Sequence, residues 1–442
     1  MLSPADLLGI GIVAAGDPQA EVEPETPHVL NLLRPLESGS VEARALFELY
    51  AGEAAVLVKS PPGAGKSTLV ARIVARLVGQ DAWKVVVACV TKNACADIAE
   101  SIATALGWTE GDPPVVFVKS WPAYTERPGW LARDGASLSK GVVVRTLASC
   151  EMSPPACELL VIDEAYQATY ASFANAADAA EQVLLVGDPG QIGPVIQGDT
   201  RLYESHTGRI SPHAQAPHAL AMPGSPVTPI VLNLTTTYRV GPDTVEALRP
   251  LYDFRFESSR PQRTMFSTDR SVTYPEIASM ELPVATKADI ASMTAVADAA
   301  QAMIGRHVDT VHANGVKEAT TIDPSSVAVV VAHRDQRAAV AAILESRGLG
   351  GISVGTADSL QGGQWLGVVA LDPCVGHPEA GQHQLTPGRL CVMASRHMAH
   401  LMWVHHGTWL KSLEAVASDP QASARTVLDA QAGIAVRRAL VG

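Results

Sequence analysis

The most specific signal in the chain is the run Ser60-Pro61-Pro62-Gly63-Ala64-Gly65-Lys66-Ser67-Thr68, which lies between an apolar stretch at 54–58 and a helical pattern at 69–78. Small residues let the backbone N–H groups turn toward a polyphosphate, and the N-terminus of the following helix adds its dipole. Lys66 can then reach the β- and γ-phosphates, and Ser67 can ligate Mg²⁺. The usual pattern begins with Gly, whereas this run begins with Ser60. The order of strand, loop and helix predicts a nucleotide-binding site that takes a triphosphate such as ATP together with Mg²⁺.

The bulk composition favours a cytoplasmic protein of two or three domains. With 442 residues the chain is too long for one small core. No apolar run approaches the ~20 residues of a membrane span. Asp6 and the lack of a basic patch before the apolar stretch 7–15 argue against a secretion signal. The six cysteines form no CxxC pair, which favours buried free thiols in a reducing cytosol over a metal or disulfide framework.

The formal net charge of −12 runs against a protein that coats itself with nucleic acid. A nucleic-acid strand would have to be held in a local groove, while the rest of the surface repels it. Weak affinity and strong salt dependence would follow.

Short β-branched runs alternate with helical stretches from Ala54 onward, which predicts parallel sheets with helices on both faces. A loop at 198–229, rich in Pro, His, Gly and Ser, is expected to be irregular, and the Ala-rich tail at 422–440 is expected to be helical. The predicted domains are an N-terminal extension at 1–45, a first α/β domain at 46–232 and a second at 233–442.

Two predicted strands end in polar side chains of the kind that phosphate chemistry uses. The apolar run Leu160-Val161-Ile162 is followed by Asp163 and Glu164. Asp163 can ligate Mg²⁺, and Glu164 can orient and deprotonate an attacking water. The alternative is a solvated acidic turn, which the phosphate loop earlier in the chain disfavours. In Gly187-Asp188-Pro189-Gly190-Gln191 the amide of Gln191 can sense a γ-phosphate, although Gly-Asp-Pro-Gly is also an ordinary turn sequence.

The order of these motifs resembles that of the superfamily 1 helicases, which are P-loop NTPases of the wider AAA group. The segments IDEAYQAT at 162–169 and LVGDPGQIGPV at 185–195 are most similar to the branch of the nonsense-mediated-decay RNA helicase and its DNA-helicase relatives. The resemblance covers about residues 54–404. It implies two tandem RecA-like domains, each a parallel sheet flanked by helices, with an ATP cleft between them.

The resemblance also implies roles for residues of the later motifs. In the first domain Thr91, Asn93 and Thr146 would touch the nucleic-acid backbone. Tyr238 would stack on the base of the nucleotide, and Arg239 would reach the γ-phosphate.

In the second domain, His333 and Thr356 lie in motifs that resemble nucleic-acid contacts, and Gln364 in one that reaches the nucleotide. Arg396 would be a second arginine finger. For both arginines the alternative is a surface salt bridge. Because Lys66 and Arg396 come from different domains, ATP is expected to close the cleft and hydrolysis to reopen it.

Several positions depart from the family pattern. No Gln occurs between Ala20 and Val78, where the family reads adenine, so several nucleoside triphosphates can serve. Gln364 stands where the family places Glu, and Met398 where a second basic residue is common. Only about 45 residues separate Ala96 from Gly141, so accessory insertions are short. A reduced clamp around the strand indicates low processivity or dependence on a partner.

Two further groups of residues have alternative interpretations. Trp121, Tyr124 and Trp130 lie among arginines and can stack on single-stranded bases, but packing of the loop against its domain is favoured. The histidines near the C-terminus alternate along a predicted strand without a cysteine pattern, which favours a structural role over a metal site (His397, His400, His405 and His406).

The first functional hypothesis is an ATP-dependent translocase or helicase that moves 5′ to 3′ on single-stranded DNA or RNA and is monomeric on its own. The second is a nucleic-acid-stimulated ATPase switch or loading subunit that works with a protein partner and does not unwind. A P-loop kinase or unrelated ATPase is disfavoured by the paired arginine motifs.

Overall fold

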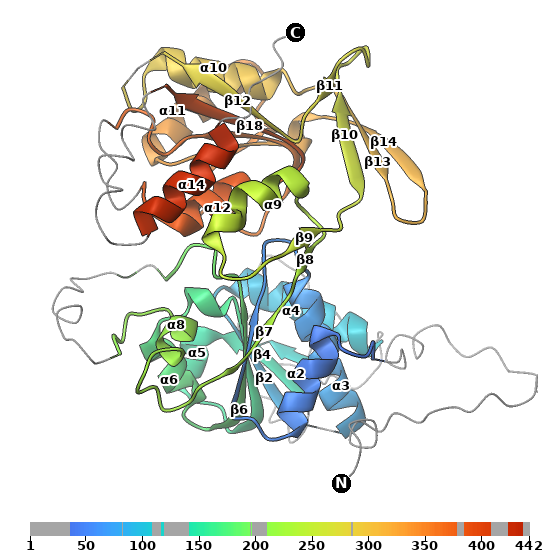
Figure 1. The fold of residues 1–442 in the computed structure, drawn as a ribbon, viewed down its shortest axis with the longest axis vertical. Coiled ribbons are helices and arrows are strands. Elements are labelled where there is room, and N and C mark those ends of the chain that lie inside the picture. Colours follow the sequence, from blue (N-terminus) through green and yellow to red (C-terminus); the bar gives the residue numbers. More distant parts are fainter. Residues whose placement is uncertain are drawn as a thin grey trace, which may run out of the picture. The chain divides into compact units, whose positions relative to one another are not determined.

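The computed structural model describes residues 36–81, 83–107, 116–118, 141–194, 196, 210–283, 286–377, 384–407 and 423–435 (Figure 1). The chain forms two compact units. Unit 1 takes the described residues of Met1–Ser60, Gly65–Asp188 and Gly193–Leu234. Unit 2 takes those of Pro61–Ala64, Pro189–Ile192 and Thr235–Gly442. Most of the expected N-terminal extension, the aromatic segment around Trp121 and part of the predicted irregular loop lie outside the described residues.

Unit 1 is built around a parallel sheet with the strand order β3-β4-β2-β5-β6-β1-β7. Its strands are β1 (Ala55–Lys59), β2 (Lys84–Cys89), β3 (Val116–Val118), β4 (Gly141–Thr146), β5 (Cys157–Asp163), β6 (Ala180–Gly187) and β7 (Ile230–Asn233). Its helices are α2 (Val41–Tyr50), α3 (Lys66–Asp81), α4 (Lys92–Leu106), α5 (Leu147–Met152), the 3-10 turn η2 (Ala165–Gln167), α6 (Tyr170–Ala177) and α8 (Ala216–Leu220).

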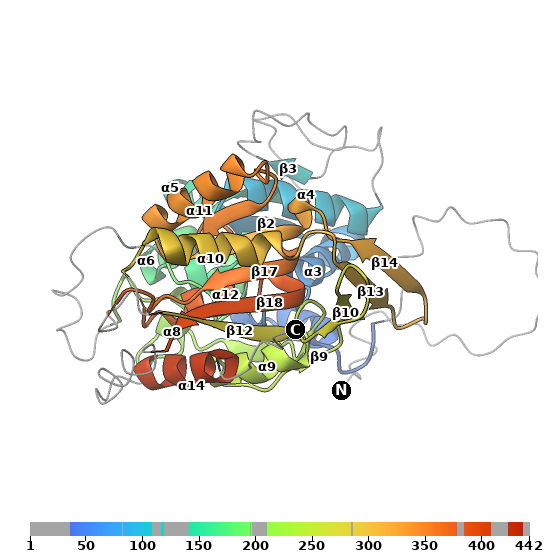
Figure 2. The ribbon, with the colours of Figure 1, turned by 90° about the horizontal axis from the view of Figure 1, so that it is seen from above.

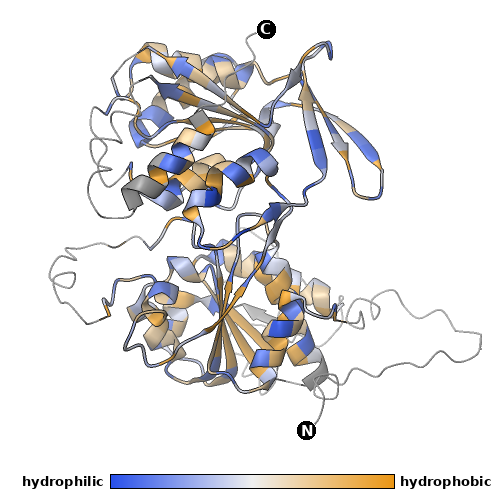
Figure 3. Ribbon diagram, viewed as in Figure 1, coloured by the Kyte–Doolittle hydropathy of each residue, from blue (hydrophilic) through white to orange (hydrophobic). Residues whose placement is uncertain are grey.

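Both faces of the unit 1 sheet are covered by helices, which explains why its central strands are apolar throughout (Figure 3). Helices α2, α3 and α4 pack on one face in a core that includes Leu46, Ile73 and Ile98. Helices α5, α6 and α8 pack on the other face around Tyr166 and Phe173. Figure 1 shows the two helical layers on either side of the strands.

Unit 2 contains a second parallel sheet with the order β12-β18-β17-β15-β16 and a separate antiparallel sheet with the order β11-β10-β13-β14. Its strands are β8 (Thr236–Thr237), β9 (Glu257–Ser258), β10 (Gln262–Phe266), β11 (Thr273–Tyr274), β12 (Ile277–Leu282), β13 (His307–Val311), β14 (Lys317–Thr321), β15 (Val327–Val331), β16 (Ser353–Thr356), β17 (Trp365–Leu371) and β18 (His397–His406). Its helices are α9 (Pro242–Leu248), η3 (Arg249–Leu251), α10 (Ile290–Gln301), η4 (Pro324–Ser326), α11 (Arg334–Ser346), α12 (Pro387–Ala394) and α14 (Ser423–Ala435).

Helices also cover both faces of the parallel sheet of unit 2 (Figure 2). Helices α9, α12 and α14 pack against one face around Trp403, and α10 and α11 pack against the other around Val296 and Leu344. Each unit is thus a parallel sheet flanked by helices, which confirms the expected α/β class and the RecA-like architecture. Helix α14 also lies within the tail that was expected to be helical.

The antiparallel sheet of unit 2 was not predicted, and the expectation of purely parallel sheets is incomplete on this point. Its strands are short and carry mixed polar and charged residues, as in Lys317–Thr321, where most residues are exposed. Its buried residues, such as Met265 and Val308, alternate with polar residues over strands of five residues or fewer, and this pattern is too short to identify a sheet from the sequence.

All six cysteines are buried and free, as expected. Within the described parts of the chain, no helix is long and apolar enough to cross a bilayer. In the same parts, no group of three or more His, Cys, Asp or Glu side chains is arranged to hold a metal ion.

Burial of His400 generates a prediction about stability. Its Nδ1 lies 2.7 Å from the carbonyl oxygen of Pro275, and its buried Nε2 has no hydrogen-bond partner among the described residues. Protonation would place an unpaired charge in the core, so burial lowers the pKa of His400 to about 4.

A histidine of the unfolded chain titrates near ~6.5, so the unfolded state takes up the proton first as the pH falls. The stabilisation from neutral His400 is therefore complete above that pH and is lost between about pH 6.5 and 4. We expect this residue to account for up to ~3 kcal/mol of the fall in unfolding free energy across that window. Urea unfolding at pH 7 and pH 4.5 should show a smaller difference in His400→Gln than in the wild type. An equal difference in both proteins would contradict the assignment.

Candidate functional site

The carboxyl ends of β1, β5 and β6 lie at one edge of the unit 1 sheet, because these strands are parallel neighbours. The phosphate loop leaves β1 at this edge, and Asp163 is the last residue of β5. Lys66 begins α3, so Lys66, Ser67 and Thr68 belong to its first turn. The N–H groups of a first turn point toward the N-terminal end of the helix and have no intrahelical acceptor. This edge is where parallel α/β sheets bind ligands.

The first residues of the phosphate loop, Pro61–Ala64, belong to unit 2 and contact the segment that carries Arg239. The Thr237 hydroxyl donates to the carbonyl of Pro62 at 2.7 Å, and the Tyr238 N–H donates to the carbonyl of Gly63 at 2.9 Å. Gly63 has φ +73°, and a Cβ added there would stand 2.2 Å from the Cβ of Arg239. Only glycine fits this position, so Arg239 lies directly against the loop backbone.

The main chain of Tyr238 and the Cβ of Arg239 thereby lie beside the loop, and the roles predicted for the two side chains stay predictions. Tyr238 is 57% exposed, which leaves its ring accessible for stacking on a base. Ala64 is buried beside the same loop backbone, whereas Gly65, Ser67 and Thr68 are exposed.

Lys66 and Glu164 also come together, within unit 1. The Lys66 Nζ lies 3.4 Å from the Glu164 Oε1. Glu164 has the left-handed conformation, with φ +55° and ψ +45°, and among the described non-glycine residues a positive φ occurs only here and at Arg270. Such backbone strain in a residue with a Cβ is costly and concentrates at functional sites, so it supports the role predicted for Glu164.

Asp163 is a buried carboxylate that accepts a 3.0 Å hydrogen bond from the N–H of Glu164. Burial and the neighbouring Glu164 charge raise its pKa to about 7, against the opposing effect of Lys66. An oxygen ligand in so negative a setting fits a hard divalent cation, as does the exposed Ser67 hydroxyl. The side chains present therefore suit the predicted Mg²⁺.

Gln191 belongs to a segment that packs within unit 2. Its Oε1 accepts a 3.0 Å hydrogen bond from the Nε2 of Gln361. Gln361 begins the segment Gln361-Gly362-Gly363-Gln364, here called the Gln-Gly motif, and was not predicted as a site residue. A Cβ on Gly190 would meet the Tyr252 hydroxyl at 2.3 Å, and one on Gly388 would meet the Gln191 carbonyl at 2.3 Å. The main chain around Gln191 is therefore fixed against the start of α12.

Arg396 is 1% exposed. Its guanidinium group donates to the carbonyl of Val392 at 3.2 Å, to the Ser395 hydroxyl at 2.9 Å and to the carbonyl of Gly363 at 3.5 Å. The last contact places it beside the Gln-Gly motif, whose Gln364 is exposed. A phosphate contact would require the guanidinium group to share or exchange these partners, so the arginine-finger role stays a prediction.

The nucleic-acid candidates of unit 1 lie at the ends of two paired strands. Thr146 ends β4 and pairs with Cys89, which ends β2, and Thr91 and Asn93 follow β2 directly. Thr91 and Thr146 cap α4 and α5, because their hydroxyls accept from Ala94 N–H at 3.2 Å and from Ser149 N–H at 3.3 Å. Thr91 and Asn93 are exposed, and Thr146 is half-buried.

His333 and Thr356 have equivalent places in unit 2. Thr356 ends β16 and pairs with Val331, the last residue of β15, and His333 begins the turn into α11. The Nε2 atoms of His333 and His377 lie 3.0 Å apart. Both predicted residues therefore stand at one carboxyl edge of their sheet.

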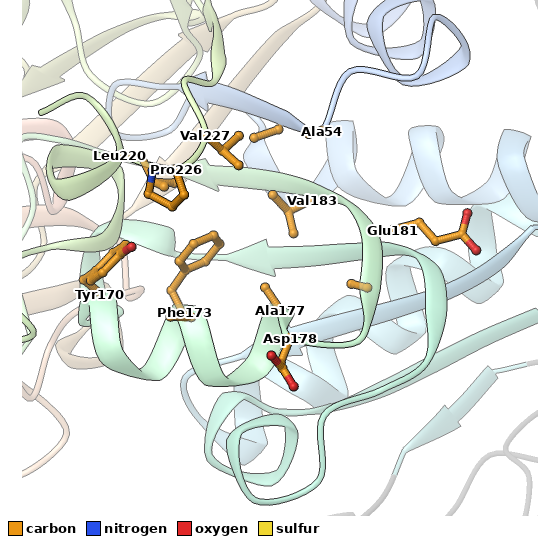
Figure 4. A pocket seen from close by; sticks show the side chains of 13 residues that line it. Ala54, Tyr170, Phe173, Ala177, Asp178, Glu181, Val183, Leu220, Pro226 and Val227 are labelled. Carbon is orange, nitrogen blue, oxygen red and sulfur yellow. The ribbon is translucent and has the colours of Figure 1, made fainter. Parts of the chain in front are cut away.

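Unit 1 also has an apolar pocket of about 260 Å³ (Figure 4). It lies among α6, the end of α8 and the starts of β1 and β6, and contains none of the predicted site residues; its lining includes Tyr170, Phe173, Val183, Leu220, Pro226 and Val227. Because ligands of parallel sheets bind at the carboxyl ends of strands, this pocket is not part of the candidate site.

Residues 42–206 match a family model described as an AAA domain. This match supports a P-loop NTPase domain over the segment that contains the phosphate loop, Asp163, Glu164 and Gln191. No curated protein matches the chain.

Three solved helicases show a partial likeness to the structure. The PRRSV helicase is 15% identical with a TM-score of 0.42 and coverage of 81% of this chain and 54% of its own. An arterivirus nonstructural protein 10 helicase in complex with DNA is 16% identical with a TM-score of 0.46 and coverage of 86% and 64%. The UvsW helicase from bacteriophage T4 is 15% identical with a TM-score of 0.27 and coverage of 35% and 54%.

The chain thus spans less than two-thirds of each of these helicases. TM-scores below 0.5 do not establish a shared fold. None of the matches identifies the helicase branch that the sequence motifs resemble.

The contact between Gly63 and Arg239 generates a prediction. Gly63→Ala should lower the rate of ATP hydrolysis at least ~10-fold, because the added methyl group displaces Arg239 from the loop backbone. Gly52→Ala is the matched control, since Gly52 has φ +85° and nothing within 4 Å of an added Cβ. If both variants hydrolyse ATP at the wild-type rate, the contact has no role in turnover.

Proposed function

We propose that the protein is an ATP-dependent translocase or helicase acting on single-stranded nucleic acid. The observation that carries the proposal is the packing of Arg239 against Gly63 of the phosphate loop, together with the hydrogen bond from Thr237 to Pro62. Ordinary nucleotide-binding loops need no such arginine, and an arginine whose Cβ packs against a phosphate loop would be able to stabilise the charge that develops during phosphoryl transfer.

The proposed chemistry is ATP hydrolysis by positioning and charge stabilisation. Lys66 would bind the terminal phosphates, and Arg239 and Arg396 would reach the γ-phosphate and add positive charge in the transition state. Glu164 would accept a proton from the attacking water, and Gln191 would sense the γ-phosphate. Ser67 and Asp163 would hold Mg²⁺, which neutralises negative charge on the phosphates when bound.

The proposed nucleic-acid contacts are Thr91, Asn93 and Thr146 in unit 1 and His333 and Thr356 in unit 2. Their support is that each set stands at the carboxyl edge of a parallel sheet. Movement in the 5′-to-3′ direction rests on the motif resemblance, and both DNA and RNA remain candidate substrates. The buried free thiols support a reducing compartment such as the cytoplasm.

A nucleic-acid-stimulated ATPase switch, without unwinding activity, is the second candidate. The net charge of −12 favours it, because a surface that repels phosphates suits a subunit held on its strand by a protein partner.

We expect single-stranded DNA or RNA oligomers to stimulate ATP hydrolysis, and the stimulation to fall steeply with added salt. Steady-state phosphate release, measured with each oligomer and without nucleic acid, tests this. Lack of stimulation by both polymers would remove the basis of both candidate functions. Duplexes with 5′ or 3′ tails then separate the candidates, because only a helicase displaces the paired strand.

Glu164→Gln should retain ATP binding and lose turnover by at least ~100-fold, since the amide cannot accept a proton from water. Lys66→Ala should lose binding itself, because it removes the cation that holds the phosphates. Fluorescent ATP-analogue titrations and single-turnover hydrolysis measure the two effects separately. Retained turnover in Glu164→Gln would show that the water-activating residue lies elsewhere.

A further inference from the structure

Glu276 is the centre of a buried polar cluster in unit 2 that the proposed chemistry does not use. Its side chain is 6% exposed, and Glu276 directly precedes β12 in the chain. One carboxylate oxygen accepts from the Gly241 N–H at 2.8 Å and from the Thr244 hydroxyl at 2.5 Å. The other accepts from the Asp243 N–H at 3.2 Å. The carboxylate therefore caps the start of α9 from a distant part of the chain.

The guanidinium group of Arg260 and the imidazole ring of His397 complete the cluster. The Nη2 of Arg260 lies 3.3 Å from Glu276 Oε2, and the Nε2 of His397 lies 3.4 Å from Oε1 and 3.0 Å from the Thr244 hydroxyl oxygen. Burial alone would raise the pKa of Glu276, but the contacts with His397, Arg260 and Thr244 lower it to about 2. The carboxylate is thus ionised and fully engaged with donors.

The packing around Glu276 leaves no free volume at the start of α9. A Cβ on Gly241 would stand 2.2 Å from Glu276 Oε2 and 2.3 Å from Arg260 Nη2. Arg260 also donates to the carbonyl of Met398, the residue after His397. The cluster therefore joins the main chain at 241–244 to the main chain at 397–398.

These two segments adjoin the two predicted catalytic arginines. Gly241 is two residues after Arg239, and His397 directly follows Arg396. Both arginines belong to unit 2 together with Glu276, so their relative positions are set within one compact unit. A buried, multiply bonded carboxylate gives these segments a single arrangement, because each lost hydrogen bond would leave a donor without a partner.

We propose that Glu276 is a positioning residue that holds Arg239 and Arg396 in the arrangement required for ATP hydrolysis. The inference rests on the proposed function, since it acts through the arginines assigned there. It predicts an effect on kcat rather than on ATP affinity, because Lys66 and the start of α3 belong to unit 1.

The test compares wild type, Glu276→Gln, Arg239→Ala and the double variant in full-length protein with saturating single-stranded oligomer. In Glu276→Gln the amide directs N–H groups at backbone donors, so kcat should fall at least ~10-fold while the KM for ATP changes less than ~3-fold. If Glu276 acts through Arg239, the double variant should have the same kcat as Arg239→Ala within ~2-fold. Effects that multiply, or an unchanged kcat in Glu276→Gln, would overturn the proposal.

Two further variants keep the test decisive. Asp309→Asn is the matched control, because Asp309 forms an exposed ion pair with Arg270 at 3.0 Å in the antiparallel sheet, and its kcat should equal that of the wild type. If Glu276→Gln does not fold, Thr244→Val decides, since it removes one donor to the carboxylate and should lower kcat ~3-fold with the KM unchanged. A wild-type kcat in that folded variant would overturn the proposal. A wild-type protein without ATPase activity would instead overturn the proposed function, and the role of Glu276 with it.

Discussion

The close approach of the Arg239 motif to the phosphate loop is the constraint on which the candidate site depends. Backbone carbonyls of Pro62 and Gly63 accept hydrogen bonds from Thr237 and Tyr238, and the absence of a side chain at Gly63 lets Arg239 reach the loop. A glycine in this loop therefore serves two purposes. It adopts a positive φ in the phosphate loop, and it leaves room for the main chain and Cβ of Arg239.

Those parts of the fold and site that depend on local sequence could be predicted. Apolar strands that are followed by a loop, a pair of acids or an amide residue indicate parallel sheets. Because the strands pair in parallel, the side chains of Lys66 and Glu164 lie 3.4 Å apart. The prediction of parallel sheets flanked by helices was confirmed for the same reason. The strand Val327–Val331 is a continuous apolar run, as expected for a strand covered on both faces, and the buried residues of the helix Arg334–Ser346 recur every four positions.

Features that depend on partners far apart in the chain could not be predicted. The antiparallel sheet has strands of five residues or fewer, and its edge strand Lys317–Thr321 is mostly exposed, so its apolar pattern is too short to identify. Gln361 meets Gln191 across 170 positions, and Glu276 meets His397 across 121. A lone polar residue has no periodicity, so only the folded chain reveals which donor it meets.

Two buried carboxylates illustrate how structure separates a framework role from a catalytic one. Glu276 is surrounded by donors, and its pKa falls to about 2 despite burial, whereas burial beside Glu164 raises the pKa of Asp163 to about 7. The first acid already has its counter-charges, so it gains nothing from a ligand. The second accepts one hydrogen bond within the described residues and stands next to a like charge, so a divalent cation would relieve the cost of its burial. Negative charge at a strand end that is not balanced by counter-charge, rather than burial or acidity alone, is therefore the feature that favours Asp163 over Glu276 as the proposed Mg²⁺ ligand.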